Sequence, residues 1–476
     1  MPLFLYHSRG ILDDEGYFMF MGKSILRGAH PYINYADNKP PGIWYLLAFV
    51  FKVFGNSIYI TRAILYLINA LSALVLYLVG KEIWNEKIGR VSALIFLIGM
   101  LIPAFDGYYV LTEPFMNLFS LLGLLLFIRA NKRTLYLAAS GVAMGISILF
   151  KQTAILLLIA MIVFYLCKIW IPANRNKKYF GASARNVLLL LCGFVVPLIP
   201  VASYFWSIGA LGQMVYYTTM SLKGFGSTIN YSSLVSDFES FSIVWLLSFA
   251  SLLAIGYKFI QKNIDREIFV GIWLLLSLFP LVLRQYGHYY IQVLPPVCLL
   301  ASLFITNLIP FLIPFKEIFR QHDYVRLFTL VTIIVFVCFS IVLSVSEGYQ
   351  MLTSDQPSYT INSFQNEMQT AFFIQSHTNT DDKILVYPYQ PAIYFLSDRN
   401  PCTNLLFLQR PPIDEKTELK LLQQIIETSP KYLVWQTDTR GSITPGLPQI
   451  DAFLGSHFRK VQSIGNFDIY VNDDDQ

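Results

Sequence analysis

Residues 58–80, IYITRAILYLINALSALVLYLVG, decide the fold class of this chain, and Arg62 is the one charged residue among them. An apolar run of roughly 17–25 residues is long enough to cross a bilayer as a helix. The composition agrees, because 55% of the 476 residues are hydrophobic and 14% are charged, whereas a soluble domain carries roughly 25% charged residues. The sequence therefore predicts an integral membrane protein.

Similar apolar runs recur along the chain and predict ten spanning helices in total. The apolar run at residues 43–54 is too short to cross comfortably, and Lys52 interrupts its end, so we expect an interfacial or re-entrant helix there. The predicted fold class is an all-α polytopic membrane protein. The spans are expected at about residues 58–80, 88–105, 115–130, 134–150, 153–170, 186–207, 241–257, 267–284, 290–312 and 326–346.

The composition changes near residue 347, where polar residues become more frequent and apolar runs shorten. We therefore expect two domains, a membrane domain over residues 1–346 and a small α/β domain over residues 347–476. In the second domain we expect strands at Lys383–Tyr387 and Tyr432–Gln436, an amphipathic helix at Lys416–Glu427, and a hairpin of Lys460–Ile464 and Phe467–Val471.

The distribution of basic residues predicts the orientation in the membrane. The loops at 81–90, 129–133, 168–185, 258–266 and 316–326 carry 17 Lys and Arg, whereas the alternate loops carry Lys151, Lys223 and Arg284. Basic loops stay in the cytoplasm, so the N-terminal segment and the tail are expected outside an inner or plasma membrane. The net charge of +5 reflects this topology and does not indicate nucleic-acid binding. Residues 1–7 are too short to span, so we expect a first helix upstream of this chain.

An acidic cluster, Asp13, Asp14 and Glu15, lies ahead of the first span. Three adjacent carboxylates repel one another and are buried only where a cation or a proton compensates them. At a membrane face such a cluster indicates chemistry. The structural alternative is a hydrated helix N-terminus, with the helix over Gly16–Leu26.

Lys39 follows in the turn Asp37-Asn38-Lys39-Pro40-Pro41. The two prolines fix the backbone ahead of a helix start. They direct Lys39 at the headgroup layer, where an ammonium meets a lipid phosphate. The alternative is ordinary snorkelling of a lysine side chain.

Five more ionisable residues fall on the same predicted membrane face, namely Asp106, Glu113, Lys151, Arg284 and His288. Ionisable groups within apolar sequence usually face a site, and Arg with His suits an anionic oxygen. The alternatives are a helix-start carboxylate for Glu113 and a polar helix connection for Arg284 and His288. Their convergence on one face favours a site.

The cysteines and acidic residues indicate neither a metal nor a cofactor. Cys402 is the one cysteine in the tail and the other four lie in apolar spans, so no disulfide framework or cysteine-based zinc site is available. A divalent ion shared by Asp14 and Glu113 stays open.

At these residues the chain resembles the polyprenyl-phosphate-sugar-dependent glycosyltransferases of the membrane-embedded GT-C class. More closely, it resembles bacterial relatives of protein O-mannosyltransferases and of the lipid A aminoarabinose transferases. The resemblance covers roughly residues 10–310. The matching pieces are Asp14-Glu15 with Tyr17, Gly28-Ala29-His30-Pro31-Tyr32, Lys39-Pro40-Pro41, Phe54-Gly55 with Arg62, Thr112-Glu113-Pro114, Lys151-Gln152, and His288-Tyr289 with Pro295-Pro296.

The resemblance implies that a sugar passes from a polyprenyl-phosphate donor to an acceptor hydroxyl on the extracytoplasmic face, with inversion at the anomeric carbon. A carboxylate takes the proton of the acceptor, and cations hold the charge of the departing phosphate. It implies that Asp14 is the base, that Glu15 positions the acceptor or tunes Asp14, and that Asp13 belongs to the same catalytic group. Lys39, Lys151, Arg284 and His288 are implied as ligands of the donor phosphate, and Tyr17, Tyr32, Asp106 and Glu113 as acceptor or second-site residues.

Two other functions compete with this interpretation. A lipid-linked glycan flippase would place polar groups near the bilayer midplane, in broken helices from internal repeats, and neither is evident here. A polymerase or ligase of undecaprenyl-linked glycans would favour Arg and His late in the chain over an acidic cluster at its start. The sugar, and whether the acceptor is a lipid, a glycan or a protein, cannot be read from these residues.

Overall fold

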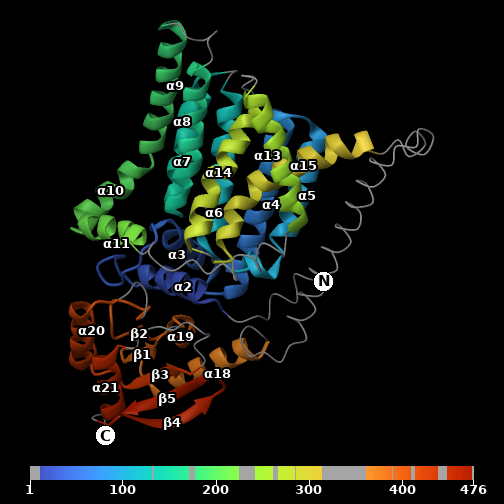
Figure 1. Ribbon diagram of the computed structural model, residues 1–476. Coiled ribbons are helices and arrows are strands. Elements are labelled where there is room, and N and C mark those ends of the chain that lie inside the picture. The colour runs from blue at the N-terminus through green and yellow to red at the C-terminus, as the bar shows by residue number, and fades with distance from the viewer. Residues whose placement is uncertain are drawn as a thin grey trace. The chain divides into compact units, whose positions relative to one another are not determined.

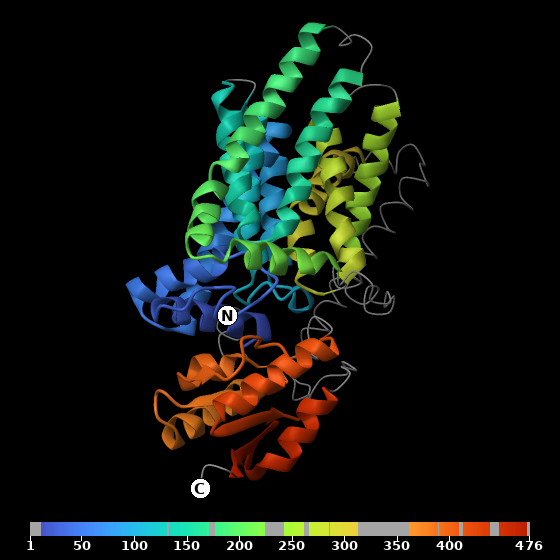
Figure 2. The same ribbon diagram turned by 90° about the vertical axis from the view of Figure 1, so that its left-hand side faces the viewer.

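The computed structural model divides the chain into two compact units (Figure 1, Figure 2). The N/C unit comprises Met1–Arg62, Phe205–Gly226 and Ser354–Gln476, and the helical unit comprises Ala63–Tyr204 and Ser227–Thr353. The expected domain boundary at 346/347 and the expected span at 326–346 lie outside the described residues. The structure describes residues 11–130, 133–170, 177–223, 242–260, 266–284, 286–312, 361–388, 390–408, 413–437 and 447–473.

The helical unit is a bundle of apolar helices, and α4 and α10 also extend into the N/C unit. Two short 3₁₀ turns, η1 (Pro103–Phe105) and η2 (Gln152–Ala154), lie between its helices. The helices are α4 (Ile58–Ile83), α5 (Glu86–Gly99), α6 (Thr112–Arg129), α7 (Leu135–Ile148), α8 (Ile155–Trp170), α9 (Lys177–Val195), α10 (Leu198–Ser207), α13 (Ser242–Ile260), α14 (Arg266–Arg284) and α15 (Tyr289–Leu312).

The sequence predictions of apolar helices agree with this bundle, with two differences. The run expected at 88–105 ends as helix at Gly99, and the run expected at 186–207 divides between α9 and α10. A proline at position 197, which cannot continue the hydrogen-bond ladder, lies at that division. By length and composition, 4 stretches of described helix can cross a membrane: Ile58–Ile83, Thr112–Arg129, Phe180–Ser207 and Tyr289–Thr306.

Small polar residues join α6 to α7. The Ser140 hydroxyl donates to the Gly123 carbonyl at 2.7 Å, and the Ser147 hydroxyl donates to the Met116 carbonyl at 2.8 Å. The hydroxyls of Ser120 and Ser147 lie 2.7 Å apart. Small side chains let helix backbones approach closely in a membrane, and their hydroxyls add bonds between helices.

Glycines perform the same role between α7 and α9. A Cβ placed on Gly141 or Gly145 would collide with the carbonyl oxygens of Leu190 or Phe194 on α9, and one on Gly193 would collide with α7. The spacing Gly141-x-x-x-Gly145 puts two glycines on one helix face. Van der Waals contact between these two backbones therefore depends on the missing side chains.

We expect Gly145→Ala to destabilise the helical unit by about 1–3 kcal/mol, because the added methyl overpacks a backbone contact. Thermal unfolding in detergent measures the effect. Gly181→Ala in α9 is the matched control, since a Cβ there meets no atom within 4 Å, and its unfolding midpoint should stay the same or rise slightly. Equal midpoints for the two variants would contradict the close packing.

The C-terminal part of the N/C unit is the small α/β fold predicted from the sequence. Its five-stranded sheet has the order β2-β1-β3-β5-β4, with β2, β1 and β3 parallel and with β5 antiparallel to both β3 and β4. The strands are β1 (Lys383–Tyr387), β2 (Asn400–Pro401), β3 (Tyr432–Gln436), β4 (Phe458–Ile464) and β5 (Phe467–Asn472). The helices are α18 (Ile361–His377), α19 (Ala392–Ser397), α20 (Glu415–Thr428) and α21 (Pro448–His457).

The register of the sheet follows the apolar pattern of its strands. The sequence predicted β1 and β3 with these same bounds, and the β4–β5 hairpin turns at Gly465, whose φ is 56°. Leu385 and Leu433 from adjacent strands share a buried cluster with Leu421 and Ile425 of α20. The amphipathic helix expected at 416–427 is thus the helix that covers this face of the sheet.

The N-terminal segment contributes α2 (Asp13–Leu26) and α3 (Gly42–Phe54) to the N/C unit, and the middle segment contributes α11 (Leu211–Lys223). A Cβ on Gly16 of α2 would lie 2.7 Å from the Ala392 nitrogen of α19, so these helices touch backbone to backbone. Phe51 of α3 stacks on Phe395 at 5.7 Å between ring centroids. Lys23 pairs with Asp398 at the end of α19. The packing of α2 and α3 with the tail was not predicted from the sequence.

Candidate active site

The acidic cluster forms the first turn of α2. Asp13, Asp14 and Glu15 open this helix, and the preceding residue, Leu12, provides no side-chain cap. Carboxylates at a helix start interact favourably with the exposed backbone amides and the helix dipole. The helix expected at 16–26 therefore begins three residues earlier, and the cluster is part of it.

Glu15 differs from Asp13 and Asp14 because its carboxylate forms a buried ion pair with Arg62. The Arg62 Nε donates to Glu15 Oε1 at 3.1 Å and its Nη2 donates to Oε2 at 2.7 Å. The two side chains are 0% and 1% exposed. A planar guanidinium that meets both carboxylate oxygens is the most favourable geometry for such a pair. Both carboxylate oxygens of Glu15 are therefore engaged by the Arg62 guanidinium.

Asp14 lies on the half-exposed side of the same turn and meets Lys39. Asp14 Oδ2 is 3.7 Å from Lys39 Nζ, and the two side chains are 25% and 18% exposed. The Tyr32 hydroxyl donates to the Lys39 carbonyl at 2.7 Å, and Tyr32 itself has a φ of 67°. That conformation costs a non-glycine residue energy, and the Tyr32 hydroxyl bond links this strained residue to the backbone of Lys39.

Asp37 joins this group, and the sequence analysis treated it only as part of the turn. Its Oδ1 accepts from the Asn38 amide at 2.6 Å, while Oδ2 is buried without a hydrogen-bond partner among the described residues. Burial raises the pKa of Asp37 to about 6, with Lys39 acting against the rise and Asp14 adding to it. Two carboxylates thus share one lysine.

Tyr17 and Tyr32 line the apolar side of this group. The Tyr17 ring lies 6.2 Å from Trp44 and 5.3 Å from Phe407, between ring centroids. Its hydroxyl and the Trp44 Nε1 are buried without a hydrogen-bond partner in the part of the chain that the structure describes. Buried donors of this kind are rare unless water or a ligand meets them, so this wall is suited to binding a polar group.

Glu367 of α18 is a further buried carboxylate that the sequence analysis missed. Its Oε2 accepts from the Ile11 amide at 3.1 Å, and its Oε1 accepts from the Gln390 side chain at 2.9 Å. Burial raises the pKa of Glu367 to about 8; Asp13 and Glu15 add to the rise, and the Ile11 bond and Arg62 oppose it. Glu367 therefore ties Ile11, two residues before the acidic cluster, to the tail.

A second polar cluster lies in the helical unit. Glu113 at the start of α6 forms a buried ion pair with Lys151, which precedes η2. His288 Nε2 is 3.7 Å from the same Glu113 Oε1, and the Thr112 hydroxyl donates to Oε2 at 3.0 Å. The Lys151 ammonium lies 3.7 Å from the centroid of the Tyr289 ring, a cation–π distance. Three loops far apart in sequence supply these groups.

Asp106 lies beside the same loops. A Cβ on Gly287 would lie 3.4 Å from Asp106 Oδ2, so the Asp106 carboxylate contacts the turn that carries His288. Phe105 stacks on Tyr290 at 4.9 Å. Asp106 has a φ of 56°, a left-handed conformation that redirects the chain after η1. The side chain of Arg284 lies outside the described residues.

The predicted site residues therefore fall into two groups. The N/C unit brings together Asp14, Lys39, Tyr17 and Tyr32, and adds Asp37. The helical unit brings together Asp106, Glu113, Lys151 and His288. Among the residues that the structure describes, no three His, Cys, Asp or Glu side chains are grouped to hold a metal ion. An ion shared by Asp14 and Glu113 would join different units and stays a hypothesis.

We expect Lys151→Met to destabilise the helical unit by about 3–5 kcal/mol, because it leaves the Glu113 carboxylate buried without its lysine. The double variant Lys151→Met/Glu113→Leu should recover most of that loss. Thermal unfolding in detergent measures both. Glu86→Gln removes one partner of the exposed Arg90 pair, and the unfolding midpoint of this control should stay close to that of the unaltered chain. Additive losses in the double variant would contradict the buried pair.

We expect the stability of the N/C unit to fall as the pH rises from 6 to 9. The pKa of Glu367 is raised from its model-compound value of 4.5 to about 8, so its contribution is complete below about pH 4.5 and is lost as the pH passes 8. The loss is on the order of 2 kcal/mol. In Glu367→Gln the unfolding midpoint should depend less on pH, whereas the exposed control Glu427→Gln should behave like the unaltered chain. An unchanged pH profile in Glu367→Gln would contradict the raised pKa.

The sequence matches the model of a family described as dolichyl-phosphate-mannose-protein mannosyltransferase, over residues 38–221. The matched region contains Lys39, Asp106, Glu113 and Lys151, whereas the acidic cluster of α2 precedes it. A search of curated protein sequences finds no match.

Solved structures of two proteins, ArnT and the oligosaccharyltransferase AglB, share the fold. ArnT from Cupriavidus metallidurans bound to undecaprenyl phosphate has a TM-score of 0.61 and 12% identity, and the match covers 99% of this chain and 96% of that one. Archaeoglobus fulgidus AglB with an inhibitory peptide and a dolichol-phosphate has a TM-score of 0.56 and 13% identity, with 98% and 71% covered. The chain spans 66% of the apo form of that oligosaccharyltransferase, with a TM-score of 0.55 and 13% identity over 90% of this chain.

Proposed function

We propose that this chain is a membrane-embedded glycosyltransferase of the GT-C class, which transfers a sugar from a polyprenyl phosphate to an acceptor hydroxyl. The family model is of a transferase that uses a lipid-phosphate sugar. Two structures of the same fold were solved with undecaprenyl phosphate and with a dolichol-phosphate. These findings favour the transferase over a flippase, which would move such a lipid without breaking it.

The reaction needs one base and one group of cations. The acceptor oxygen forms a bond to the anomeric carbon of the sugar as the bond from that carbon to the phosphate oxygen breaks. The bonding electrons leave with the phosphate, and the proton of the acceptor hydroxyl passes to a carboxylate. The phosphate departs as a stabilised anion, so no general acid is required. A single displacement of this kind inverts the anomeric carbon.

The pairing of Asp14 with Lys39, at 3.7 Å, is the observation that carries the proposal. Asp14 is the base, and its half-exposed carboxylate is within reach of an acceptor from solvent. Lys39 compensates its charge and attracts the donor phosphate, since an ammonium at the headgroup layer binds lipid phosphates. Asp37 lies behind both groups, and its raised pKa suits a residue that relays or shares the proton.

In the helical unit, the Lys151 ammonium pairs with Glu113, and His288 Nε2 lies 3.7 Å from the same carboxylate. Lys151 and His288 bind the donor phosphate, or they belong to the acceptor or second site predicted for Glu113 and Asp106. Arg284, at the end of α14, adds a further cation. Because the Lys39 side chain is 18% exposed and that of Lys151 is 4% exposed, we expect Lys39 to dominate phosphate binding. The reaction takes place at the extracytoplasmic face, where the distribution of Lys and Arg predicts the N-terminal segment and the tail.

We expect Asp14→Asn to abolish transfer, a loss of about 10²–10⁴-fold in kcat, because the amide cannot accept the acceptor proton. Purified enzyme with radiolabelled polyprenyl-phosphate sugars and lipid, glycan and protein acceptors measures turnover. Folding and the binding of undecaprenyl phosphate should be retained in this variant.

The exposed residue Asp381 provides the matched control, since Asp381→Asn makes the same chemical change in the tail. Its turnover should equal that of the unaltered enzyme. Near-normal turnover in Asp14→Asn would refute the assignment of the base, and loss in Asp37→Asn alone would transfer that role to Asp37.

A further inference from the structure

Ile11, Glu367 and Gln390 form a buried polar contact between the N-terminal segment and the tail. The Ile11 amide donates to Glu367 Oε2 at 3.1 Å, and Gln390 Nε2 donates to Glu367 Oε1 at 2.9 Å. Gln390 Nε2 also lies 3.5 Å from the Ile11 carbonyl oxygen. The three residues are 1%, 3% and 6% exposed, in that order. Both oxygens of one carboxyl group are thus used, away from water, to hold one backbone position.

Asp14 lies between this contact and the buried pair of Glu15 and Arg62. Ile11 is three residues before Asp14, and Glu15 follows it directly. Both anchors are buried, whereas the Asp14 side chain is 25% exposed. A short segment held at both ends has little freedom, since each fixed residue loses its two soft backbone dihedrals. The position of the Asp14 carboxylate therefore depends on both anchors.

The tail also holds the turn that carries Lys39. The Ala36 amide, three residues before Lys39, donates to the Asn404 carbonyl at 3.0 Å. The Asn404 amide in turn donates to the Gln424 side chain of α20 at 3.1 Å. Asp14 and Lys39 thus each follow, by three residues, a backbone position that the tail bonds. The tail is the common support of the two charged groups.

Gln390 takes part in this contact from a costly backbone conformation. Its φ is 77°, in the left-handed region that side chains other than glycine and asparagine seldom adopt. Strain of this kind persists where the surrounding structure requires it. Asparagine would tolerate the conformation better, but its side chain is one carbon shorter. The reach of the Gln390 amide to Glu367 accounts for glutamine at this position.

We propose that Glu367 is a positioning residue for the transfer reaction, which holds the acidic turn through the Ile11 backbone so that the Asp14 carboxylate meets the acceptor hydroxyl. The inference rests on the proposed function, because that function makes Asp14 the base. Glu367 itself takes no proton from the acceptor. The tail is then part of the machinery that orients the base, since a base contributes only when it is held within reach of the proton it accepts.

Glu367 performs this role in its neutral form. Burial raises the pKa of Glu367 to about 8, so the carboxyl group carries a proton at pH 7. Glutamine has the same shape and no charge. Its oxygen can accept from the Ile11 amide, and its amide group can donate to a Gln390 amide that has turned over. The charged groups that face Glu367 are Asp13 and Glu15 of α2 and Arg62 of α4.

The test compares Glu367→Leu, which removes both hydrogen bonds, with Glu367→Gln, which keeps them. With radiolabelled polyprenyl-phosphate sugars at pH 7, kcat should fall about 10–100-fold in Glu367→Leu, because a small misplacement of the base is enough for such a loss. The KM for the donor should stay within about 2-fold, since Lys39 is retained. In Glu367→Gln, kcat should stay within about 3-fold of the unaltered enzyme.

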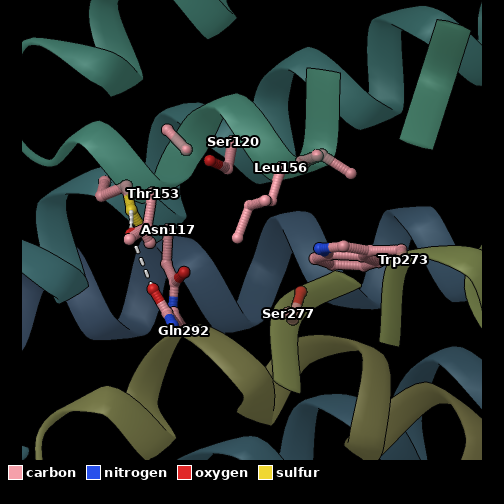
Figure 3. A pocket seen from close by; sticks show the side chains of 10 residues that line it. Asn117, Ser120, Thr153, Leu156, Trp273, Ser277 and Gln292 are labelled. Atoms are coloured by element: carbon pink, nitrogen blue, oxygen red, sulfur yellow. Dashed lines mark hydrogen bonds between the residues drawn. The ribbon is translucent and has the colours of Figure 1, made fainter. Parts of the chain in front are cut away.

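Hydrogen–deuterium exchange over residues 11–26 reports the state of the turn without any donor. These amides should exchange about 5-fold or more faster in Glu367→Leu than in the unaltered chain or in Glu367→Gln. The matched control is Gln292→Leu in the helical unit. Gln292 is likewise a buried amide, 5% exposed, and its Oε1 accepts from the Thr153 hydroxyl at 2.7 Å (Figure 3). This control should leave exchange over residues 11–26 unchanged.

The two measurements separate this inference from the proposed function. An unaltered enzyme that transfers no sugar from any lipid phosphate overturns the proposed function, and the exchange comparison then decides alone whether Glu367 fixes the turn. Equal exchange in Glu367→Leu and the unaltered chain overturns the inference. So does an unchanged kcat in Glu367→Leu, or an equal loss in Glu367→Gln. Where Glu367→Leu does not fold, Gln390→Leu removes one of the two bonds and should show the same pattern with a smaller loss.

Discussion

The buried pair of Glu15 and Arg62 is the interaction on which the arrangement of the N/C unit depends. Its two hydrogen bonds fix the first turn of α2 against the start of α4, and the next residue back, Asp14, inherits that position. An ion pair taken out of water contributes little net stability, yet the loss of one partner is costly because it strands a charge. The main effect of the pair is therefore to fix the position of the acidic turn, and its contribution to the free energy of unfolding is small.

The helical unit also contains a buried ion pair that fixes the position of polar residues. Glu113, Lys151 and His288 come from three separate connections, and each is compensated by another. Around them, glycines and serines let the helices approach, so the polar groups are held by close packing instead of by loops. Both units thus surround a few paired charges with apolar helices, which is how an apolar protein retains ionisable groups for chemistry.

Local pattern was enough to predict the apolar helices and the strands β1 and β3. It also singled out Asp14 and Lys39 of one group and Asp106, Glu113, Lys151 and His288 of the other. It could not predict partners, because pairing depends on contacts between distant segments. Glu15 was grouped with Asp14 from its position in the chain, whereas the structure assigns it to Arg62. The sequence predicts Asp37 only as a turn residue, because the burial of its Oδ2 depends on tertiary contacts. Glu367 lies in a tail helix with no motif, and nothing local marks it as a partner of Ile11.

The bond between Glu367 and the Ile11 amide spans 356 residues, and this affects the order in which the protein matures. A ribosome adds roughly 5–20 residues per second, so α2 leaves it tens of seconds before α18 and α19 exist. During that interval Gly16 lacks the α19 backbone that it touches in the finished protein. The packing around α2 is therefore complete only after α18 and α19 have been synthesised.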